Sequence, residues 1–253
     1  MNNELKPLFL ETPNVQNFGV MMKALSADAG RGRLACVWGQ AGRGKTETAI
    51  HYHAAHASIF MRAKIVWTKR SMLRDLCREL QVNATPRTAS DAFDAAVDCL
   101  RAELAAHPGY VLFIDEIERL PKDFMEICRD LTDLSGVPIV LIGEEELPVL
   151  MRSMRRIWSR TPEAMEFKPL DAAVVVAAAR SWGGFKLEIG VAADIWAATG
   201  GDMRTLRNIL GSMLMLLAAD KAETASKELA GRAIRLGLRE LPQPRKRGQG
   251  VAS

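Results

Sequence analysis

The sequence predicts an α/β fold, in which a parallel sheet carries helices on both faces and a small all-helical domain follows. Up to about residue 168, short apolar runs without polar alternation are separated by segments of helix length. This pattern is typical of strands buried on both faces of a parallel sheet. From Asp171 onward only helical periodicity remains. We therefore expect an α/β core over residues 1–168, a helical domain over 169–240 and a basic, disordered tail over 241–253.

The composition is that of an ordinary globular protein. Of 253 residues, 48% are apolar and 25% are charged, and 34 Lys and Arg against 30 Asp and Glu leave a net charge of +4. These values exclude a wholly disordered chain and permit a nucleic-acid partner without requiring one. No apolar run approaches the roughly 18 residues of a membrane span, Met1–Lys6 lacks the layout of a secretory signal, and the four cysteines are scattered. We expect a cytoplasmic protein with no membrane partner.

Each predicted element follows from a local pattern. Leu34–Trp38 is an apolar run that stops at Gly39, which indicates a buried strand. Thr68 is a candidate cap for a helix whose apolar residues recur at helical spacing. We expect strands at 34–38, 58–62, 65–67, 110–114 and 138–142, core helices at 46–57, after Thr68, at 91–106 and at 121–134, and later helices at about 171–182, 191–198, 202–219 and 224–240.

A complete P-loop motif, G-x-x-x-x-G-K-[ST], lies between a predicted strand and a predicted helix. Its glycines let backbone N–H groups turn toward phosphate oxygens, and the helix that begins there adds its dipole to the anion site. Lys45 would reach the β- and γ-phosphates of ATP, and the Thr46 hydroxyl would ligate Mg²⁺. The alternative is a glycine-rich turn without a ligand. The motif consists of Gly39, Gln40, Ala41, Gly42, Arg43, Gly44, Lys45 and Thr46.

Two acidic residues, Asp115 and Glu116, follow the apolar strand that ends at Ile114. Ligands of open parallel sheets bind beyond the carboxyl ends of the strands, so both acids are expected beside the P-loop. Asp115 would hold the Mg²⁺ shell, and Glu116 would polarise a water for attack on the γ-phosphate. Taken alone, the pair would be an ordinary acidic turn.

Two groups of arginines are candidates for sensing or stabilising the nucleotide. Arg152, Arg156 and Arg160 are spaced four apart, with Arg155 adjacent, so we expect them on one face of a helix. One of them could act on the γ-phosphate of a neighbouring subunit. A solvated or DNA-contacting face is an equally good interpretation of any single member. Arg204, in the first turn of a later helix, could reach the bound nucleotide or be an ordinary surface arginine.

These motifs follow one another in an order that resembles the AAA+ ATPases. More narrowly, the chain is similar to the MuB-type transposition ATPases, which are relatives of TnsC and IstB and more distantly of origin-recognition ATPases. The resemblance covers about residues 10–240. The residues that carry it are Gly39–Thr46, Ile114–Glu116, the arginine-bearing stretch after residue 147, Gly201–Arg204, Val66–Arg70 and the segment from Asn14 to the P-loop.

The resemblance implies an AAA+ P-loop NTPase core, with the strand ending at Trp38 placed centrally, and a helical lid. It also implies ATP-dependent assembly on duplex DNA in the cytoplasm of a bacterium or a phage-infected host, with the filament marking a target and stimulating a transposase. Lys45, Thr46, Asp115 and Glu116 would bind and hydrolyse ATP. One arginine of the group Arg152, Arg155, Arg156 and Arg160, with Arg156 and Arg160 preferred, would act in trans, and Arg204 would be the lid arginine.

The chain departs from this family in two places. Many members carry Asn or Thr after the fourth core strand as a γ-phosphate sensor, whereas here Gly143 is followed by Glu144, Glu145 and Glu146. A carboxylate there would repel the phosphate, so either Glu144 points away or hydrolysis is slow. Because the segment before Gly39 is short, we also expect no N-terminal DNA-binding appendage of the kind usual in MuB proteins.

DNA contact is therefore expected from the core and the tail. Lys69, Arg70 and Lys122 are the candidate contacts, and Arg245–Arg247 is either a tether or a soluble end. Binding would follow the phosphate backbone without regard to sequence and would weaken steeply with salt. Solvated loop charge is the alternative for Lys69 and Arg70.

The favoured function is a DNA-stimulated ATPase that assembles on duplex DNA and activates a transposase. A nucleotide switch, such as a helicase loader or a replication-initiation protein, is the alternative, because the Glu144 departure weakens the expectation of hydrolysis. A small-molecule kinase is disfavoured. A kinase must keep water away from the γ-phosphate, whereas the Asp115–Glu116 pair would activate it.

Overall fold

The computed structural model describes residues 5–27, 33–82 and 86–238. These residues form two compact units, which are described separately below. One unit spans Glu11–Pro169 and holds the sheet. The other combines the chain from Leu170 onward with the N-terminal segment up to Leu10.

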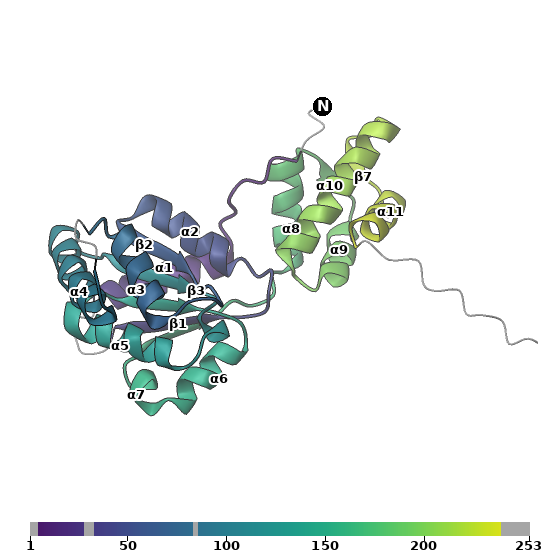
Figure 1. Ribbon diagram of the computed structural model, residues 1–253. Helices are drawn as coiled ribbons and strands as arrows, with labels where there is room; N and C mark the ends of the chain where they lie inside the picture. The colour runs from purple at the N-terminus through teal and green to yellow at the C-terminus, as the bar shows by residue number, and fades with distance from the viewer. Residues whose placement is uncertain (1–4, 28–32, 83–85, 239–253) are drawn as a thin grey trace, which may run out of the picture. The chain divides into compact units, whose positions relative to one another are not determined.

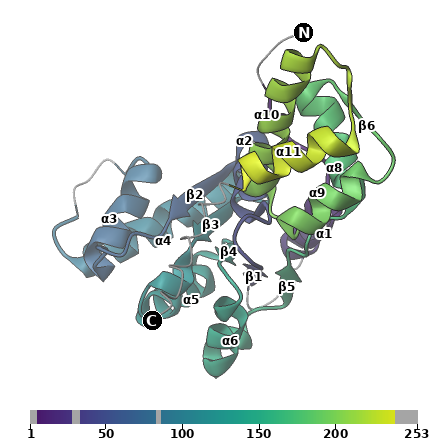
Figure 2. The same cartoon turned by 90° about the vertical axis from the view of Figure 1, so that its right-hand side faces the viewer.

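The first unit contains the predicted parallel sheet. All neighbouring strands pair in parallel, in the order β2-β3-β4-β1-β5, which can be followed across the sheet in Figure 2. β1 therefore lies inside the sheet, and the α/β prediction is confirmed. The strands are β1 (Leu34–Trp38), β2 (Ser58–Arg62), β3 (Val111–Asp115), β4 (Ile139–Ile142) and β5 (Glu163–Glu166).

Helices cover both faces of this sheet (Figure 1). On one face, Phe18 packs against Phe113 and Phe167 in a buried cluster. On the other, a larger apolar cluster includes Leu112 and Ile114, which alternate along β3 with residues of the first cluster. The first face carries α1 (Pro13–Ala27) and α2 (Lys45–Ala55), and the second carries α3 (Lys69–Glu79), α4 (Ala89–Ala106), α5 (Asp123–Ser135), α6 (Glu146–Ser153) and α7 (Arg155–Trp158).

Several predicted local features differ in the structure. Thr68 caps α3 as predicted, in a reciprocal pair with Ser71, because its side chain satisfies a free N–H of the first turn. The expected strand at 65–67 is wrong: this segment is a turn in which the Trp67 N–H donates to the Lys64 carbonyl at 2.8 Å. Helix α1 and edge strand β5 were not predicted. β5 has only two apolar residues, Ala164 and Met165, between two glutamates, and such a short run has no clear strand signal.

The second unit is helical, as expected, with one small ladder of strands in addition. Two parallel two-residue strands pair, which is too short for any periodicity to reveal. The expected end tail, residues 241–253, lies outside the described residues. The elements are α8 (Ala172–Ala178), a π-helical turn η2 (Ala179–Gly183), β6 (Lys186–Leu187), α9 (Val191–Thr199), α10 (Met203–Asp220), β7 (Thr224–Ala225) and α11 (Lys227–Gly237).

The N-terminal segment differs from the expected domain boundary, which placed residues 1–10 with the core. The Lys6 N–H donates to the Trp182 carbonyl at 3.0 Å, and the Trp182 indole N–H donates to the Leu8 carbonyl at 2.7 Å. Leu5 and Leu10 pack against the apolar cluster of the helical unit. Burying these side chains explains why the segment belongs to the second unit.

Candidate nucleotide-binding site

The P-loop connects β1 to α2 at the carboxyl end of the sheet, and two of its glycines are required by geometry. Gly39 has φ +146°, and a Cβ there would lie 2.6 Å from the Phe167 carbonyl oxygen. Gly44 has φ +90° and caps the start of α2 in the left-handed region. The loop therefore turns directly into a helix N-terminus, where free N–H groups and the helix dipole favour an anion.

Lys45 is, with Arg43, one of two buried cations in this loop. Its side chain folds back so that Nζ donates to the Gly39 carbonyl at 2.5 Å and to the Gln40 carbonyl at 2.9 Å. Arg43 donates to the Gln40 side chain at 2.6 Å and supports the same turn. Burial reduces screening, so the ammonium of Lys45 makes the interior of the loop strongly attractive to phosphate. The predicted binding residues 39–46 thus form the continuous connection between β1 and α2.

Thr46 and Asp115 lie far apart in the sequence but are in contact in the structure. Thr46 is the last residue of the P-loop that follows β1, and Asp115 is the last residue of β3. The Thr46 hydroxyl donates to the Asp115 carboxylate at 2.9 Å, and Asp115 is only 2% exposed. The Arg62 guanidinium lies 3.3 Å from the same carboxylate oxygen, because Arg62 and Asp115 are paired residues of β2 and β3. A hydroxyl and a carboxylate are hard oxygen donors of the kind that Mg²⁺ uses beside a bound phosphate. These residues fit the predicted metal.

Glu116 begins a short 3₁₀ turn, η1 (Ile117–Arg119), just beyond β3. Its backbone is left-handed, with φ +59° and ψ +32°, which is uncommon outside glycine and is often found at functional sites. Its carboxylate forms an ion pair with Arg119, three residues on. The turn places Glu116 at the carboxyl end of the sheet, directly after Asp115, and its backbone N–H donates to the Asp115 carboxylate at 3.1 Å.

The arginine prediction needs correction. Helix α6 ends at Ser153 and the chain turns at Met154, with φ −104° and ψ +84°, so Arg152, Arg156 and Arg160 do not share one helix face. Their surroundings also differ. Arg152 lies over the Trp158 ring, 5.0 Å from its centroid, and Arg160 forms an ion pair with Asp133 at 2.9 Å. Arg155 and Arg156 are exposed in α7, which leaves Arg156 the more accessible of the two preferred residues.

Arg204 belongs to the helical unit, in the first turn of α10. The Asp202 side chain caps this helix by accepting the N–H groups of Arg204 at 2.7 Å and Thr205 at 2.9 Å. This cap fixes the backbone of Arg204 at the start of α10, and the Arg204 side chain is exposed. Its role toward the nucleotide stays a prediction.

The candidate DNA contacts Lys69, Arg70 and Lys122 are all exposed. Lys69 starts α3 and pairs at 2.8 Å with Asp123, the residue after Lys122, so the starts of α3 and α5 lie together. Both partners are more than half exposed, so this ion pair adds little stability and would exchange readily for a phosphate. Arg70 donates to the Arg87 carbonyl, and Lys122 donates to the Ser153 hydroxyl at 3.2 Å.

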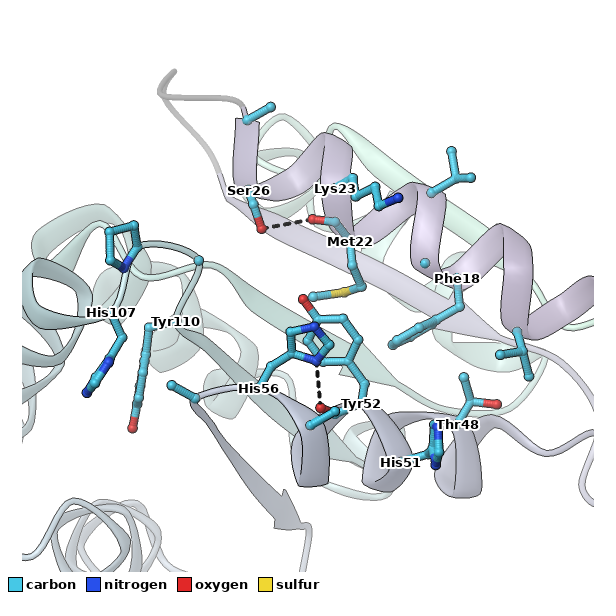
Figure 3. Close-up of a pocket in the computed structure, with 18 of the residues that line it drawn as sticks. Phe18, Met22, Lys23, Ser26, Thr48, His51, Tyr52, His56, His107 and Tyr110 are labelled. Atoms are coloured by element: carbon cyan, nitrogen blue, oxygen red, sulfur yellow. Dashed lines mark hydrogen bonds between the residues drawn. The ribbon is translucent and has the colours of Figure 1, made fainter. Parts of the chain in front are cut away.

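A separate groove of about 1150 Å³ lies between α1, α2 and the loop before β3 (Figure 3). Tyr52 and His56 stack there at 3.9 Å, with His107 and Tyr110 nearby on the facing loop. Its lining includes none of the P-loop residues and neither Asp115 nor Glu116. Within the described ranges, no three histidine, cysteine or carboxylate side chains cluster as a metal site, and no helix is long and apolar enough to cross a membrane. The groove is not the predicted nucleotide site.

Sequence reasoning missed two residues of this site. Arg62 ends β2 and could have been found only from its register with β3. Glu118 follows Glu116 by two positions, and nothing local distinguishes it from the other acids of the turn. The structure shows its carboxylate partly buried under the loop after β4.

Comparison with known proteins agrees with this fold. A family model described as an AAA domain matches residues 28–151. The chain is 24% identical over 186 residues to the Mu-like prophage FluMu DNA transposition protein B of Haemophilus influenzae, covering 70% of this chain and 62% of that protein. It is 28% identical over 185 residues to the ATP-dependent target DNA activator B of Escherichia phage Mu, and this match covers 70% of this chain and 56% of that protein. The chain therefore spans less than two thirds of these relatives.

Solved structures show the same fold. Cdc6p of Pyrobaculum aerophilum superposes with a TM-score of 0.66 at 14% identity, covering 86% of this chain and 65% of that one. The Aeropyrum pernix ORC1 protein, solved in complex with DNA, superposes with a TM-score of 0.60 at 18% sequence identity. The match covers 85% of this chain and 64% of that one.

The parallel sheet and the P-loop, with Asp115 beside it, give this chain the fold of the AAA+ P-loop proteins. Within that class, its sequence resembles the MuB-type DNA transposition proteins.

Proposed function

We propose that this chain is a Mg²⁺-dependent ATPase that assembles on duplex DNA and acts in target selection and transposase activation during DNA transposition. The observation that carries the ATPase is the contact between Thr46 and Asp115 beside the buried Lys45. The DNA transposition role is supported by the similarity to a target DNA activator and a transposition protein.

In this proposal each residue has one task. Lys45 and the loop N–H groups hold the β- and γ-phosphates, and Thr46 with Asp115 holds Mg²⁺. The metal, when bound, neutralises charge on the phosphate oxygens. Glu116 orients a water and accepts its proton. Arg156 of a neighbouring subunit would add positive charge at the γ-phosphate.

Replication-initiation proteins share the fold at 14–18% identity, which supports the architecture without favouring their activity. ATP hydrolysis measured with and without duplex DNA, together with electron microscopy in a non-hydrolysable ATP analogue, tests the proposal. DNA-stimulated turnover and ATP-dependent filaments are expected. Stoichiometric capture of a replicative helicase without filaments would instead identify a loader.

Replacing Lys69 and Arg70 together with glutamine is expected to weaken DNA binding to the same extent on unrelated sequences. Each subunit would bind fewer phosphates, so the slope of log affinity against log salt should also become shallower, by about one unit for each phosphate released. Fluorescence anisotropy of labelled duplexes over a salt series measures both. Lys227→Gln, which removes an exposed charge from α11, is the control. An unchanged slope in the double variant would remove these residues from the DNA surface.

Arg156→Ala is expected to abolish hydrolysis while leaving ATP binding intact. Because the arginine would act on a neighbour's nucleotide, mixing Arg156→Ala with Lys45→Ala subunits should restore activity that neither variant has alone. Steady-state turnover of the mixtures measures this, and Arg152→Ala, whose guanidinium packs on Trp158, is the matched control. A mixture as inactive as its components would assign Arg156 no role across the interface.

A further inference from the structure

Glu118 bridges the two loops that follow β3 and β4. It lies in η1, and its Oε1 accepts the backbone N–H of Glu144 at 3.2 Å. The Gly143 N–H in turn donates to the Val37 carbonyl at 3.0 Å, so this loop continues directly from the paired β1 and β4 strands. Glu118 therefore connects the turn that carries Glu116 to the loop that follows β4.

The contact is close and leaves little room. A Cβ built on Gly143 would lie 2.1 Å from Glu118 Oε2 and 3.0 Å from the Leu147 Cβ. Only glycine lets the carboxylate sit against the loop backbone in this way. An alanine at this position would push the flexible Glu118 side chain off its partner.

Burying the Glu118 carboxylate in this way lowers the stability of the fold, because one of its oxygens is left without a hydrogen bond in the described part of the chain. Glu118 Oε2 is buried and has no hydrogen-bond partner among the described residues. Burial raises the pKa of the Glu118 carboxyl, and the charges of Glu144 and Asp115 raise it further, against two backbone hydrogen bonds that lower it. An apolar side chain would fill this space without leaving a polar atom unsatisfied. The reason for a carboxylate at this position must therefore be its contact with the Glu144 backbone.

Glu118 holds the backbone of a residue whose own charge matters. Glu144 is exposed in the structure. Its loop follows β4, which is flanked in the sheet by the strand that ends in the P-loop and the strand that ends in Asp115. A carboxylate turned from this loop toward a triphosphate would oppose the charge that Lys45 and Mg²⁺ neutralise.

We propose that Glu118 is a positioning residue for ATP hydrolysis: it anchors the Gly143–Glu144 backbone and so keeps the Glu144 carboxylate in solvent, away from the γ-phosphate. The inference rests on the proposed ATPase function. The sequence left two alternatives for this loop: Glu144 points away from the phosphate, or hydrolysis is slow. The inference favours the first, with the Glu144 side chain held away. It also assigns Gly143 a purpose, which is to admit the Glu118 carboxylate.

Three variants test the anchor. Glu118→Ala should lower kcat for ATP about 10-fold, because the freed loop lets Glu144 approach the phosphate, with little change in the affinity for Mg²⁺·ATP. Glu118→Gln keeps an oxygen that can accept the Glu144 N–H and should stay within about 3-fold of the wild type. Gly143→Ala should reproduce the loss, since it displaces the same carboxylate.

The decisive measurement is whether removing the Glu144 charge restores the kcat that Glu118→Ala loses. Glu144→Gln alone should change kcat little, and Glu118→Ala combined with Glu144→Gln should return to within about 3-fold of the wild type. Gly143→Ala should add no further loss in the Glu118→Ala background. Thermal unfolding of each variant separates a folding defect from a positioning defect, because a folding defect would not be rescued by Glu144→Gln.

The outcomes distinguish this inference from the proposed function. Calorimetry with Mg²⁺·ATP and turnover are measured first on the wild type, and absence of either overturns the ATPase itself. If the wild type hydrolyses ATP but Glu118→Ala is fully active, or is inactive without rescue by Glu144→Gln, the positioning role is overturned and the ATPase stands. Reduced turnover in Glu118→Ala with rescue in the double variant supports the anchor.

Discussion

Replacing Lys45 with alanine is expected to lower the affinity for Mg²⁺·ATP about 100-fold and to prevent assembly on DNA. The Lys45 ammonium is buried in the loop, where the Gly39 and Gln40 carbonyls accept its hydrogen bonds and water screens it poorly. Losing charge-assisted hydrogen bonds of this kind costs about 2–3 kcal/mol, which corresponds to roughly two orders of magnitude in binding. Isothermal titration calorimetry measures the affinity, and electron microscopy with duplex DNA measures assembly.

The control for this experiment is Lys23→Ala, which removes an exposed lysine from α1 and should leave both measurements unchanged. Wild-type affinity in Lys45→Ala would mean that the P-loop does not hold the phosphates. Filaments that form equally in Lys45→Ala would instead separate assembly from nucleotide binding.

Glu116→Gln is expected to lower kcat for ATP hydrolysis by about 10²- to 10⁴-fold, the usual contribution of a general base, while ATP still binds. Glutamine has nearly the same shape but cannot accept the proton of the attacking water. If hydrolysis releases the protein from DNA, filaments of this variant should persist with ATP, whereas wild-type filaments should disassemble. Turnover and a time course of filament length measure the two effects.

Glu126→Gln is a closely matched control for this variant. Glu116 and Glu126 are 35% and 36% exposed, and each forms an ion pair with an arginine three residues later, Arg119 and Arg129. Glu126 lies on α5 and should tolerate the change. An equal decrease in both variants would indicate that the ion pair, not the basicity of Glu116, is responsible.

Part of the nucleotide site can be predicted from sequence because its chemistry is local. The P-loop is one continuous segment, and its glycines and Lys45 have their roles within eight residues of chain. The meeting of Thr46 and Asp115 could also be expected, because the carboxyl ends of parallel strands share one edge of a sheet. The parallel sheet itself followed from the apolar strands, since strands buried on both faces show no alternation.

Other predictions failed where the pattern was short or the partner was distant. The arginine spacing suggested one helix, but the break at Met154 depends on how α6 and α7 pack on the core. β5 and the small β6–β7 ladder consist of four and two residues, too few for a periodic signal. The N-terminal segment joined the helical unit because Trp182, far along the chain, accepts and donates its hydrogen bonds.

The sequence by itself determined the α/β class, the strand-to-helix phosphate loop and the acidic pair after β3, because these depend on neighbouring residues and on the common edge of a parallel sheet. Only the tertiary structure decided that Arg62 lies beside Asp115, that Arg160 is engaged by Asp133, and that Glu118 lies against Gly143. Each of these contacts joins residues from separate elements. Their distances are set by packing, which no local pattern in the chain records.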